Sequence, residues 1–187
     1  DPSISNVVEM IVLTTSYYDD VQKWLANPIT PFPLEPTTYE LTTEFSGLNT
    51  YKSASDSLVF RSAKFKLLFG SNATPENQAR FRVVRLSDQL SDNELKTQII
   101  SAINEYFNVA NWEFGETFYF TELSTYIHQR LGSAIGSIVI LPKNLRGQLG
   151  ELFQVKAEPN ELFISTAKVT DIDIVSRLDN QTLRVDR

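Results

Sequence analysis

The most regular hydrophobic pattern in the sequence predicts a helix that begins just after Ser91. Ser91 and Glu94 stand three positions apart, the spacing of a capping box, in which each side chain satisfies a free backbone N–H of the first turn. Beyond them, apolar residues recur at intervals of three and four, as one face of a helix requires. They are Leu95, Ile99, Ile100, Ile103, Tyr106 and Phe107. The pattern stops near Asn108, where we expect the helix to end.

A second stripe of the same kind predicts another helix further along the chain. Thr121 is placed to be its N-cap, and Gly132 is placed to be the C′ residue that ends it. The stripe between them consists of Leu123, Tyr126, Ile127 and Leu131. A shorter apolar pattern over residues 19–26 predicts one more short helix near the N-terminus.

Strands are predicted where Val, Ile, Thr and aromatic residues concentrate or alternate with polar ones. The segments are 7–15, 39–45, 58–69, 81–86, 116–120, 135–141, 152–156, 161–165 and 168–175. We expect segment 7–15 to be buried, and the odd positions of segment 58–69 to face a core because most of them are apolar. The turn signal at 158–160 predicts that the two strands around it form a hairpin.

These elements predict an α+β fold with mixed or antiparallel sheets and two amphipathic helices on one face. Residues 1–79 form a β-rich N-terminal part, in which the proline-rich segment 27–36 is an extended connector. Residues 80–187 form an α+β domain in the order strand, helix, strand, helix, strand, hairpin.

The charge balance argues against nucleic acid as a partner. The net charge is −6, the sequence pI is about 4.9, and no dense run of Lys and Arg occurs. The nearest candidate is a group of strand residues that we interpret as a solvated sheet face, with Arg80 and Arg82 pointing to one side and Arg85 to the other. Its members are Lys64, Lys66, Arg80, Arg82 and Arg85.

Cysteine usage and hydropathy exclude further classes of function. The sequence has no cysteine, so disulfides and thiolate zinc sites are impossible. Its longest apolar runs are too short to cross a bilayer, and we expect no membrane partner. With a single histidine and no dense cluster of oxygen ligands, we expect no metal and no cofactor. Asp171 and Asp173 are interpreted as solvated charges on one face of a strand.

Residues that could perform catalysis are few. His128 is predicted to lie on the second helix, four positions after Ser124, so a hydrogen bond between the two side chains is conceivable. A serine within a helix lacks the sharp turn that exposes a nucleophile, however. We therefore interpret His128 as a boundary or solvent-facing residue and expect the protein not to be an enzyme.

One stretch has the composition of a sugar-binding site. Glu113, Glu116 and Glu122 flank the aromatic segment 112–120, and aromatic rings beside carboxylates bind carbohydrate by stacking and hydrogen bonding. The same composition occurs at the edge of an ordinary core and in protein interfaces. A carbohydrate- or receptor-binding module therefore stays open as the alternative function.

The segment Glu94–Pro142 combines a predicted helix that ends in Tyr106-Phe107, a Gly115-Glu116 turn, a short strand, a helix of the form L-x-x-Y-I that starts at Leu123, and a strand that ends in I-L-P. In this pattern it resembles the baseplate wedge (baseplate J-like) family of T4-like contractile-tail bacteriophages. The specific match covers about a quarter of the chain, and the remainder is compatible with a C-terminal fragment of such a protein.

The resemblance implies a structural protein without an active site. It implies self-association, as a homodimer or a ring of copies, and contacts with other wedge and sheath-proximal tail proteins. The location would be the tail baseplate of the virion, assembled in the host cytoplasm. Six residues of the matching motif are interpreted as fold-bearing first and as interface residues by hypothesis: Trp112, Phe114, Gly115, Tyr119, Leu123 and Tyr126.

Overall fold

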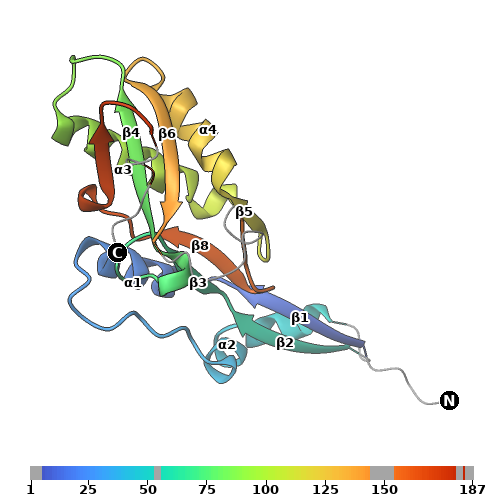
Figure 1. The fold of residues 1–187 in the computed structure, drawn as a ribbon. Helices are drawn as coiled ribbons and strands as arrows, with labels where there is room; N and C mark the ends of the chain where they lie inside the picture. The colour runs from blue at the N-terminus through green and yellow to red at the C-terminus, as the bar shows by residue number, and fades with distance from the viewer. Residues whose placement is uncertain (1–5, 53–55, 144–153, 180–182, 184–187) are drawn as a thin grey trace. The chain divides into compact units, whose positions relative to one another are not determined.

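The computed structural model describes residues 6–52, 56–143, 154–179 and 183. Helices and several small sheets are mixed along the chain, which confirms the predicted α+β class (Figure 1). The chain divides into two compact units, Asp1–Lys64 and Phe65–Arg187, so the division falls before the expected boundary at 79/80.

The first unit contains a two-stranded parallel ribbon and two helices. Strands β1 (Asn6–Val12) and β2 (Asp56–Ser62) pair in parallel, from Asn6 opposite Asp56 to Val12 opposite Ser62. Helix α1 (Thr15–Ala26) confirms the predicted N-terminal helix and buries Val21 and Trp24. The expected connector follows without helix or strand until helix α2. Helix α2 (Thr38–Glu44) and a 3₁₀ helix, η1 (Ser46–Tyr51), complete the unit.

Helix α2 contradicts the strand predicted at 39–45. Thr37 caps the helix: its hydroxyl accepts from the N–H of Glu40 at 3.3 Å, and the Glu40 carboxylate accepts from the N–H of Thr37 at 2.7 Å. This capping box outweighs the weak alternation of Tyr, Leu and Thr, because the helix needs to bury only Leu41. The N-terminal part is therefore less β-rich than predicted.

The burial expected in the first unit was also wrong in two places. Strand β1 is exposed or half-buried along its length, so the strand exists as predicted but is not buried. The predicted strand 58–69 is two strands, β2 and β3 (Lys64–Leu68), interrupted at Ala63. In β2 the prediction fails, because α2 covers the even side, so that Phe60 is buried and Val59 is 41% exposed. Further along, the odd positions Ala63, Phe65 and Phe69 are buried as predicted.

The second unit is built on a mixed three-stranded sheet with the order β6-β4-β9. The central strand β4 (Ala79–Arg85) is antiparallel to β6 (Ile135–Pro142) and parallel to β9 (Ile172–Val175). Along β4, Ala79, Phe81 and Val83 are buried and the residues between them are only half-buried. This alternation leaves one face of the sheet for the core.

Helices α3 (Asp92–Tyr106) and α4 (Phe120–Leu131) pack on that face, as predicted (Figure 1). Ser91 caps α3 with the expected capping box. The predicted N-cap of α4 was wrong: the cap is Tyr119, with no side-chain bond, because β5 runs directly into the helix. Gly132 is the C-cap with a φ of −59°, so it does not use the left-handed conformation.

The predicted hairpin at 152–165 does not form. Strand β7 (Gln154–Lys156) pairs antiparallel with β5 (Thr117–Tyr119), and β8 (Glu161–Ser165) pairs with β3. Each strand pairs with a segment far away in sequence, because its core-facing side chains pack in the cluster around Phe118 and Phe163. The predicted loop that begins at Lys143 lies outside the described residues, except for Lys143 itself.

An aromatic cluster fills the core of the second unit. Phe69 is fully buried, and its ring centroid lies 5.1–6.3 Å from those of Phe81, Phe107, Phe118 and Phe120. Its φ is 75°, and the N–H of Gly70 donates to the carbonyl of Leu68 at 3.0 Å, so Phe69 is the centre of a γ-turn. Such backbone costs of order 1–3 kcal/mol, which burial of the ring offsets.

The face of the sheet opposite the helices carries an ionic cluster. Asp173 of β9 forms hydrogen bonds with Arg80 at 2.7 and 2.9 Å and also pairs with Arg82. The two arginines thus share a face as predicted, but they are held by a carboxylate instead of being solvated. Asp171 does not share this strand face: it lies in a 3₁₀ turn (Val169–Asp171), is buried and bonds Lys143 at 3.1 Å.

Candidate functional site

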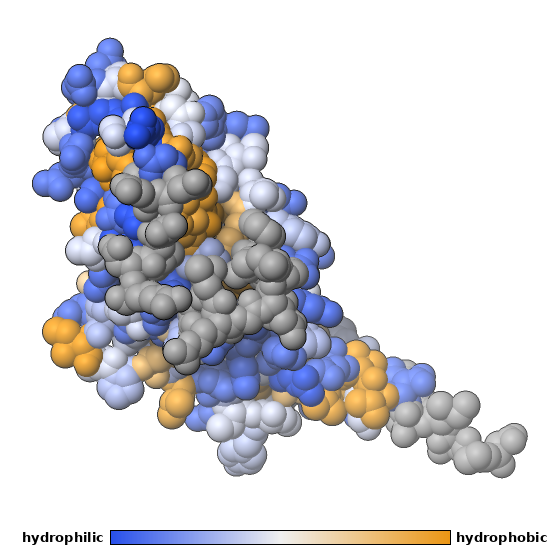
Figure 2. Space-filling model, viewed as in Figure 1, coloured by the Kyte–Doolittle hydropathy of each residue, from blue (hydrophilic) through white to orange (hydrophobic). Residues whose placement is uncertain are grey.

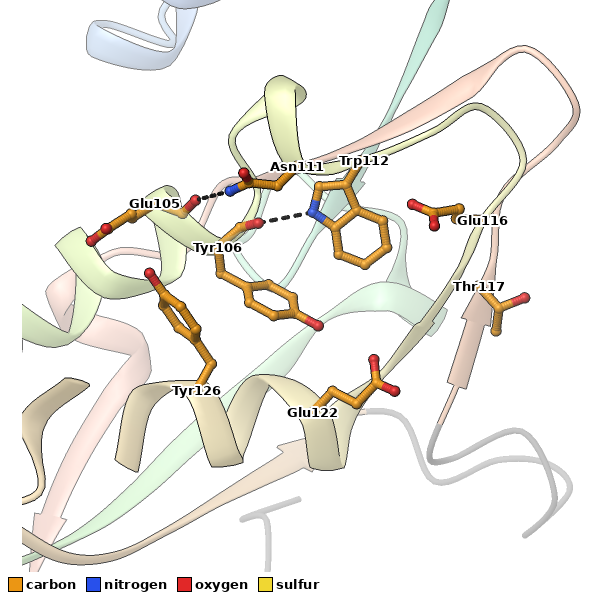
Figure 3. Close-up of a pocket in the computed structure, with 8 residues that line it drawn as sticks. All are labelled: Glu105, Tyr106, Asn111, Trp112, Glu116, Thr117, Glu122 and Tyr126. Atoms are coloured by element: carbon orange, nitrogen blue, oxygen red, sulfur yellow. Dashed lines mark hydrogen bonds between the residues drawn. The ribbon is translucent and has the colours of Figure 1, made fainter. Parts of the chain in front are cut away.

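A pocket of about 570 Å³ in the second unit brings acidic and aromatic side chains together (Figure 3). It lies where the C-terminal end of α3, a short 3₁₀ turn (Val109–Asn111), the start of β5 and the N-terminal half of α4 meet. The residues that line it are Glu105, Tyr106, Asn111, Trp112, Glu116, Thr117, Glu122 and Tyr126. All of them come from the segment with the wedge-like pattern.

The wall on the α3 side is fixed by side chains that donate to carbonyls in the last turn of that helix. The Asn111 amide donates to the carbonyl of Glu105 at 3.0 Å, and the indole N–H of Trp112 donates to the carbonyl of Tyr106 at 2.8 Å (Figure 3). Asn108 supports the turn by accepting from the N–H of Ala110 at 2.9 Å. The position of Trp112 is therefore determined by the helix end.

The aromatic rings of the pocket are continuous with the core. Trp112 stacks on Phe107 with a centroid distance of 5.6 Å and an interplanar angle of 16°. Tyr106 contacts Trp112 edge-on at 5.5 Å, and Tyr126 lies 5.2 Å from Tyr106. One face of the indole is thus already used for packing, which restricts how a ligand could stack on it.

The three carboxylates of the pocket are held in different ways. Glu105 forms an ion pair with Arg130 at 3.2 Å, in which both side chains are half-exposed or more. Glu116 accepts a hydrogen bond from the N–H of Glu113 at 2.8 Å. Glu122 lies in the first turn of α4, where the helix dipole favours a negative charge. Among the described residues, neither Glu116 nor Glu122 takes part in an ion pair.

Burial and the nearby carboxylates raise the pKa of Tyr106 and Tyr126. Burial, followed by the charges of Glu122 and Glu116, raises the pKa of Tyr106 to about 12. Partial burial, the charge of Glu105 and a hydrogen bond to that carboxylate raise the pKa of Tyr126, against a smaller opposing effect of Arg130. Both phenols therefore stay protonated at neutral pH.

The six residues predicted as a motif do not form one surface. Trp112 and Tyr126 line the pocket, whereas Leu123 is fully buried in the core and Tyr119 is 41% exposed on β5. Phe114 and Gly115 line a separate hollow, with Lys156, Ala157, Glu158 and Pro159. Gly115 has a φ of +78°, and its N–H donates to the carbonyl of Glu161 at 3.3 Å, so its role is in the turn.

Sequence reasoning grouped Glu113, Glu116 and Glu122 beside Trp112. The structure places Glu116, Glu122 and Trp112 in the pocket lining and leaves Glu113 outside it, and the prediction missed the other half of the pocket. Glu105, Tyr106, Asn111 and Thr117 were not singled out. Tyr106 was assigned to the apolar stripe of α3, although it is only partly buried. Its position in the last turn of the helix, where packing is incomplete, is the signal that could have identified Tyr106 as a pocket residue.

The conceivable pair of Ser124 and His128 is not formed. The Ser124 hydroxyl donates to the carbonyl of Phe120 at 3.0 Å, as serines in helices commonly do. His128 is exposed, and its Nε2 lies 3.4 Å from the carbonyl of Gly136. This geometry holds the serine hydroxyl away from the imidazole.

The described residues contain neither a metal-binding cluster nor a membrane-spanning helix. No three or more His, Cys, Asp or Glu side chains there come close enough together to hold a metal ion. No helix in the same residues has the length and apolar character needed to cross a membrane.

No protein-family model matches the sequence, and no curated protein matches it significantly.

Proposed function

We propose that this chain is a structural module of the baseplate wedge of a contractile phage tail, which self-associates and binds other wedge proteins during assembly. The observation that supports this most is the β1–β2 ribbon of the first unit. It leaves strand edges unpaired and apolar side chains exposed among the residues that the structure describes.

The ribbon has an uncovered face in the described part of the unit. In a parallel pair, residues opposite each other point to the same side, so Val7 and Val59 share the face that lies away from Phe60. Val7 is 66% exposed and Val59 is 41% exposed, and hydrophobic surface is visible along the ribbon in Figure 2. An ion pair of 2.9 Å between Glu9 and Arg61 crosses the same face.

Parallel strands in proteins are normally covered on both faces, and a ribbon of two strands is marginally stable alone. Unpaired edges with exposed valines are a template for a strand or an apolar surface of another chain. This favours a function in assembly over a function in solution as a monomer.

The assignment to a baseplate wedge is supported by the Glu94–Pro142 pattern. The segment folds in the order that the resemblance implies, which is helix, turn, short strand, helix and strand. The proposed partners are a second copy of the chain and the other wedge and sheath-proximal proteins, and the proposed location is the tail baseplate.

Sedimentation of the whole chain over a range of concentrations tests the proposal. We expect a species larger than the monomer, which the double substitution Val7→Lys and Val59→Lys converts to monomer. The matched control is Ile29→Lys, which makes the same change at an 83% exposed position in the connector and should leave association unchanged. A monomer at every concentration that also fails to bind wedge proteins would refute the proposal.

A carbohydrate- or receptor-binding module is the second candidate, because Trp112, Glu116 and Glu122 do meet in one pocket. It predicts binding to a glycan array that Trp112→Phe, which keeps an aromatic ring on Phe107, weakens and Glu113→Gln leaves unchanged. The stacking of Trp112 on Phe107 leaves only the other face of the indole for a sugar.

A further inference from the structure

We propose that the pocket between α3 and α4 binds an arginine or lysine side chain of a partner protein. This inference rests on the proposed function, because it assigns one contact of the assembly to a site on this chain. The residues that would hold the cation are Glu116 and Glu122, with Tyr106, Trp112 and Tyr126 as the aromatic wall.

Charge complementarity selects a cation. Three carboxylates line the pocket, and Arg130 balances only Glu105 among them. Glu116 and Glu122 come from the two sides of the entrance to α4, one before β5 and one in the first turn of the helix. Figure 3 shows both side chains around the same space as the Tyr106 ring. Among the residues that the structure describes, Glu116 and Glu122 form no ion pair, so their two negative charges are available to a ligand.

The spacing of the carboxylates selects an extended cation over a metal ion. All three glutamates are described, yet they do not form a cluster that could hold a metal. A guanidinium group or an ammonium group on a flexible stem reaches separated carboxylates, and the guanidinium donates along several directions at once. The site therefore fits a basic side chain better than Mg²⁺ or Ca²⁺.

The aromatic wall suits the same ligand. Cations are attracted to the faces of Trp and Tyr rings, and the apolar stem of Arg or Lys packs against the ring edges. The rings are held in place by the bond from Trp112 to the carbonyl of Tyr106 and by the stacking on Phe107, so little side-chain entropy is lost on binding. The raised pKa of Tyr106, due to burial and then to Glu122 and Glu116, agrees with a negative potential at the ring.

The size and continuation of the pocket favour a side chain of a protein over a free amine. The volume of about 570 Å³ is ample for one long side chain. A second hollow of about 400 Å³ shares Tyr106, Glu122 and Tyr126 with it and continues along α4 past Thr121, Thr125 and Gln129. Residues beside the inserted side chain would lie along this hollow, over hydrogen-bonding side chains of the helix.

Nuclear magnetic resonance of the whole chain tests the inference. The probe is the tripeptide acetyl-Gly-Arg-Gly-amide, and its matched control is the same peptide with citrulline, which has the shape of arginine without the charge. The indole N–H of Trp112 reports on the pocket. The indole of Trp24, which donates to the carbonyl of Thr30 at 2.7 Å in the first unit, is the internal reference.

We expect the arginine peptide to shift the Trp112 signal saturably and the citrulline peptide to leave it unchanged. Glu116→Gln with Glu122→Gln should weaken binding about a hundredfold, because each substitution removes one charged hydrogen bond and each such bond is expected to contribute about tenfold in affinity. Glu113→Gln, an exposed position outside the pocket lining, should bind as the unmodified chain does. Amide spectra of each variant establish that α3 and α4 are retained.

Equal shifts with the citrulline peptide would overturn the inference, and so would a shift with N-acetylglucosamine but not with arginine. The proposed function is separable from this result. If the double glutamine variant assembles with wedge proteins as the unmodified chain does, the pocket inference fails and the assembly function stands. If the unmodified chain binds arginine but no wedge protein, the function fails and the cation site stands.

Discussion

Strands β4 and β1 have different surroundings within their own units. In the second unit β4 has a strand on each edge and two helices over one face, and Phe81 and Val83 are fully buried. In the first unit β1 has one strand beside it among the described residues, and no residue of β1 is fully buried. The same β-rich composition therefore gives a closed core in one unit and an open ribbon in the other.

This difference suggests separate roles for the two units: the second supplies most of the stability, and the ribbon of the first is available for assembly. Stability follows buried apolar area, so the second unit carries most of it, and the ribbon opens at low free-energy cost. Because the ribbon has unpaired edges and an uncovered face among the described residues, an added strand or surface from another chain should stabilise it strongly. We expect amide hydrogens of β4 to exchange far more slowly than those of β1 in the isolated chain, and those of β1 to become protected on assembly.

The largest effect is expected from Phe118→Ala. Phe118 is fully buried and contacts the rings of Phe69, Phe107 and Phe163. Loss of the ring should lower the free energy of unfolding of the second unit by about 3–5 kcal/mol. Chemical denaturation with amide exchange measures it. Tyr119→Ala, on the same strand but 41% exposed, is the control, and an equal loss there would contradict the assigned core.

The next effect is expected from Asp173→Asn, which removes the charge that Arg80 and Arg82 share. Charged hydrogen bonds of this kind contribute about 1.5–3 kcal/mol. Burial raises the pKa of Asp173, but the hydrogen bond and charge of Arg80, then Arg82 and Lys96, outweigh it and lower the pKa below its ordinary value of 3.8.

Because the folded pKa is lower than the unfolded one, the stabilisation by Asp173 is present above pH 3.8 and lost as the pH falls through the folded value. The difference in unfolding free energy between the unmodified chain and Asp173→Asn should therefore shrink below that pH. Asp20→Asn, which breaks the exposed pair with Lys23 in the first unit, should change stability by about 0.5 kcal/mol or less. A difference that stays constant with pH would contradict the ionic role of Asp173.

An effect of similar size is expected from Gly70→Ala. A Cβ at this position would lie 2.0 Å from the carbonyl oxygen of Thr166, so β3 and the end of β8 would have to separate. Overpacking of this kind costs about 1–3 kcal/mol. Gly47→Ala in the first unit is the matched control, since a Cβ there meets nothing within 4 Å. If both substitutions have the same effect on thermal unfolding, the close packing at Gly70 is not real.

The smallest effects compare the same capping motif in the two units. Ser91→Ala removes the cap of α3 and Thr37→Ala removes the cap of α2. An N-cap contributes about 1 kcal/mol. We expect Ser91→Ala to accelerate amide exchange in α3 and Thr37→Ala to accelerate it in α2 alone. Faster exchange throughout the chain with Thr37→Ala would contradict the division into two units.

The sequence by itself determined the elements whose signals lie within a few residues of one another. Ser91 and Glu94, followed by the stripe from Leu95 to Ile103, were sufficient for α3. The apolar runs at 81–86 and 135–141 were sufficient for β4 and β6. The same capping spacing occurs at Thr37 and Glu40, where helix α2 forms in place of the predicted strand.

Only the tertiary structure decided which of these elements meet. Local patterns predicted that β7 and β8 pair with each other, whereas their partners are β5 and β3. Local patterns also grouped Glu116, Trp112 and Glu122, but not the Tyr106 and Glu105 that complete the pocket. The physical reason is that capping and side-chain periodicity act between neighbours in sequence. Strand pairing and pocket walls depend on which distant side chains fill the same core space, and composition along the chain does not encode that directly.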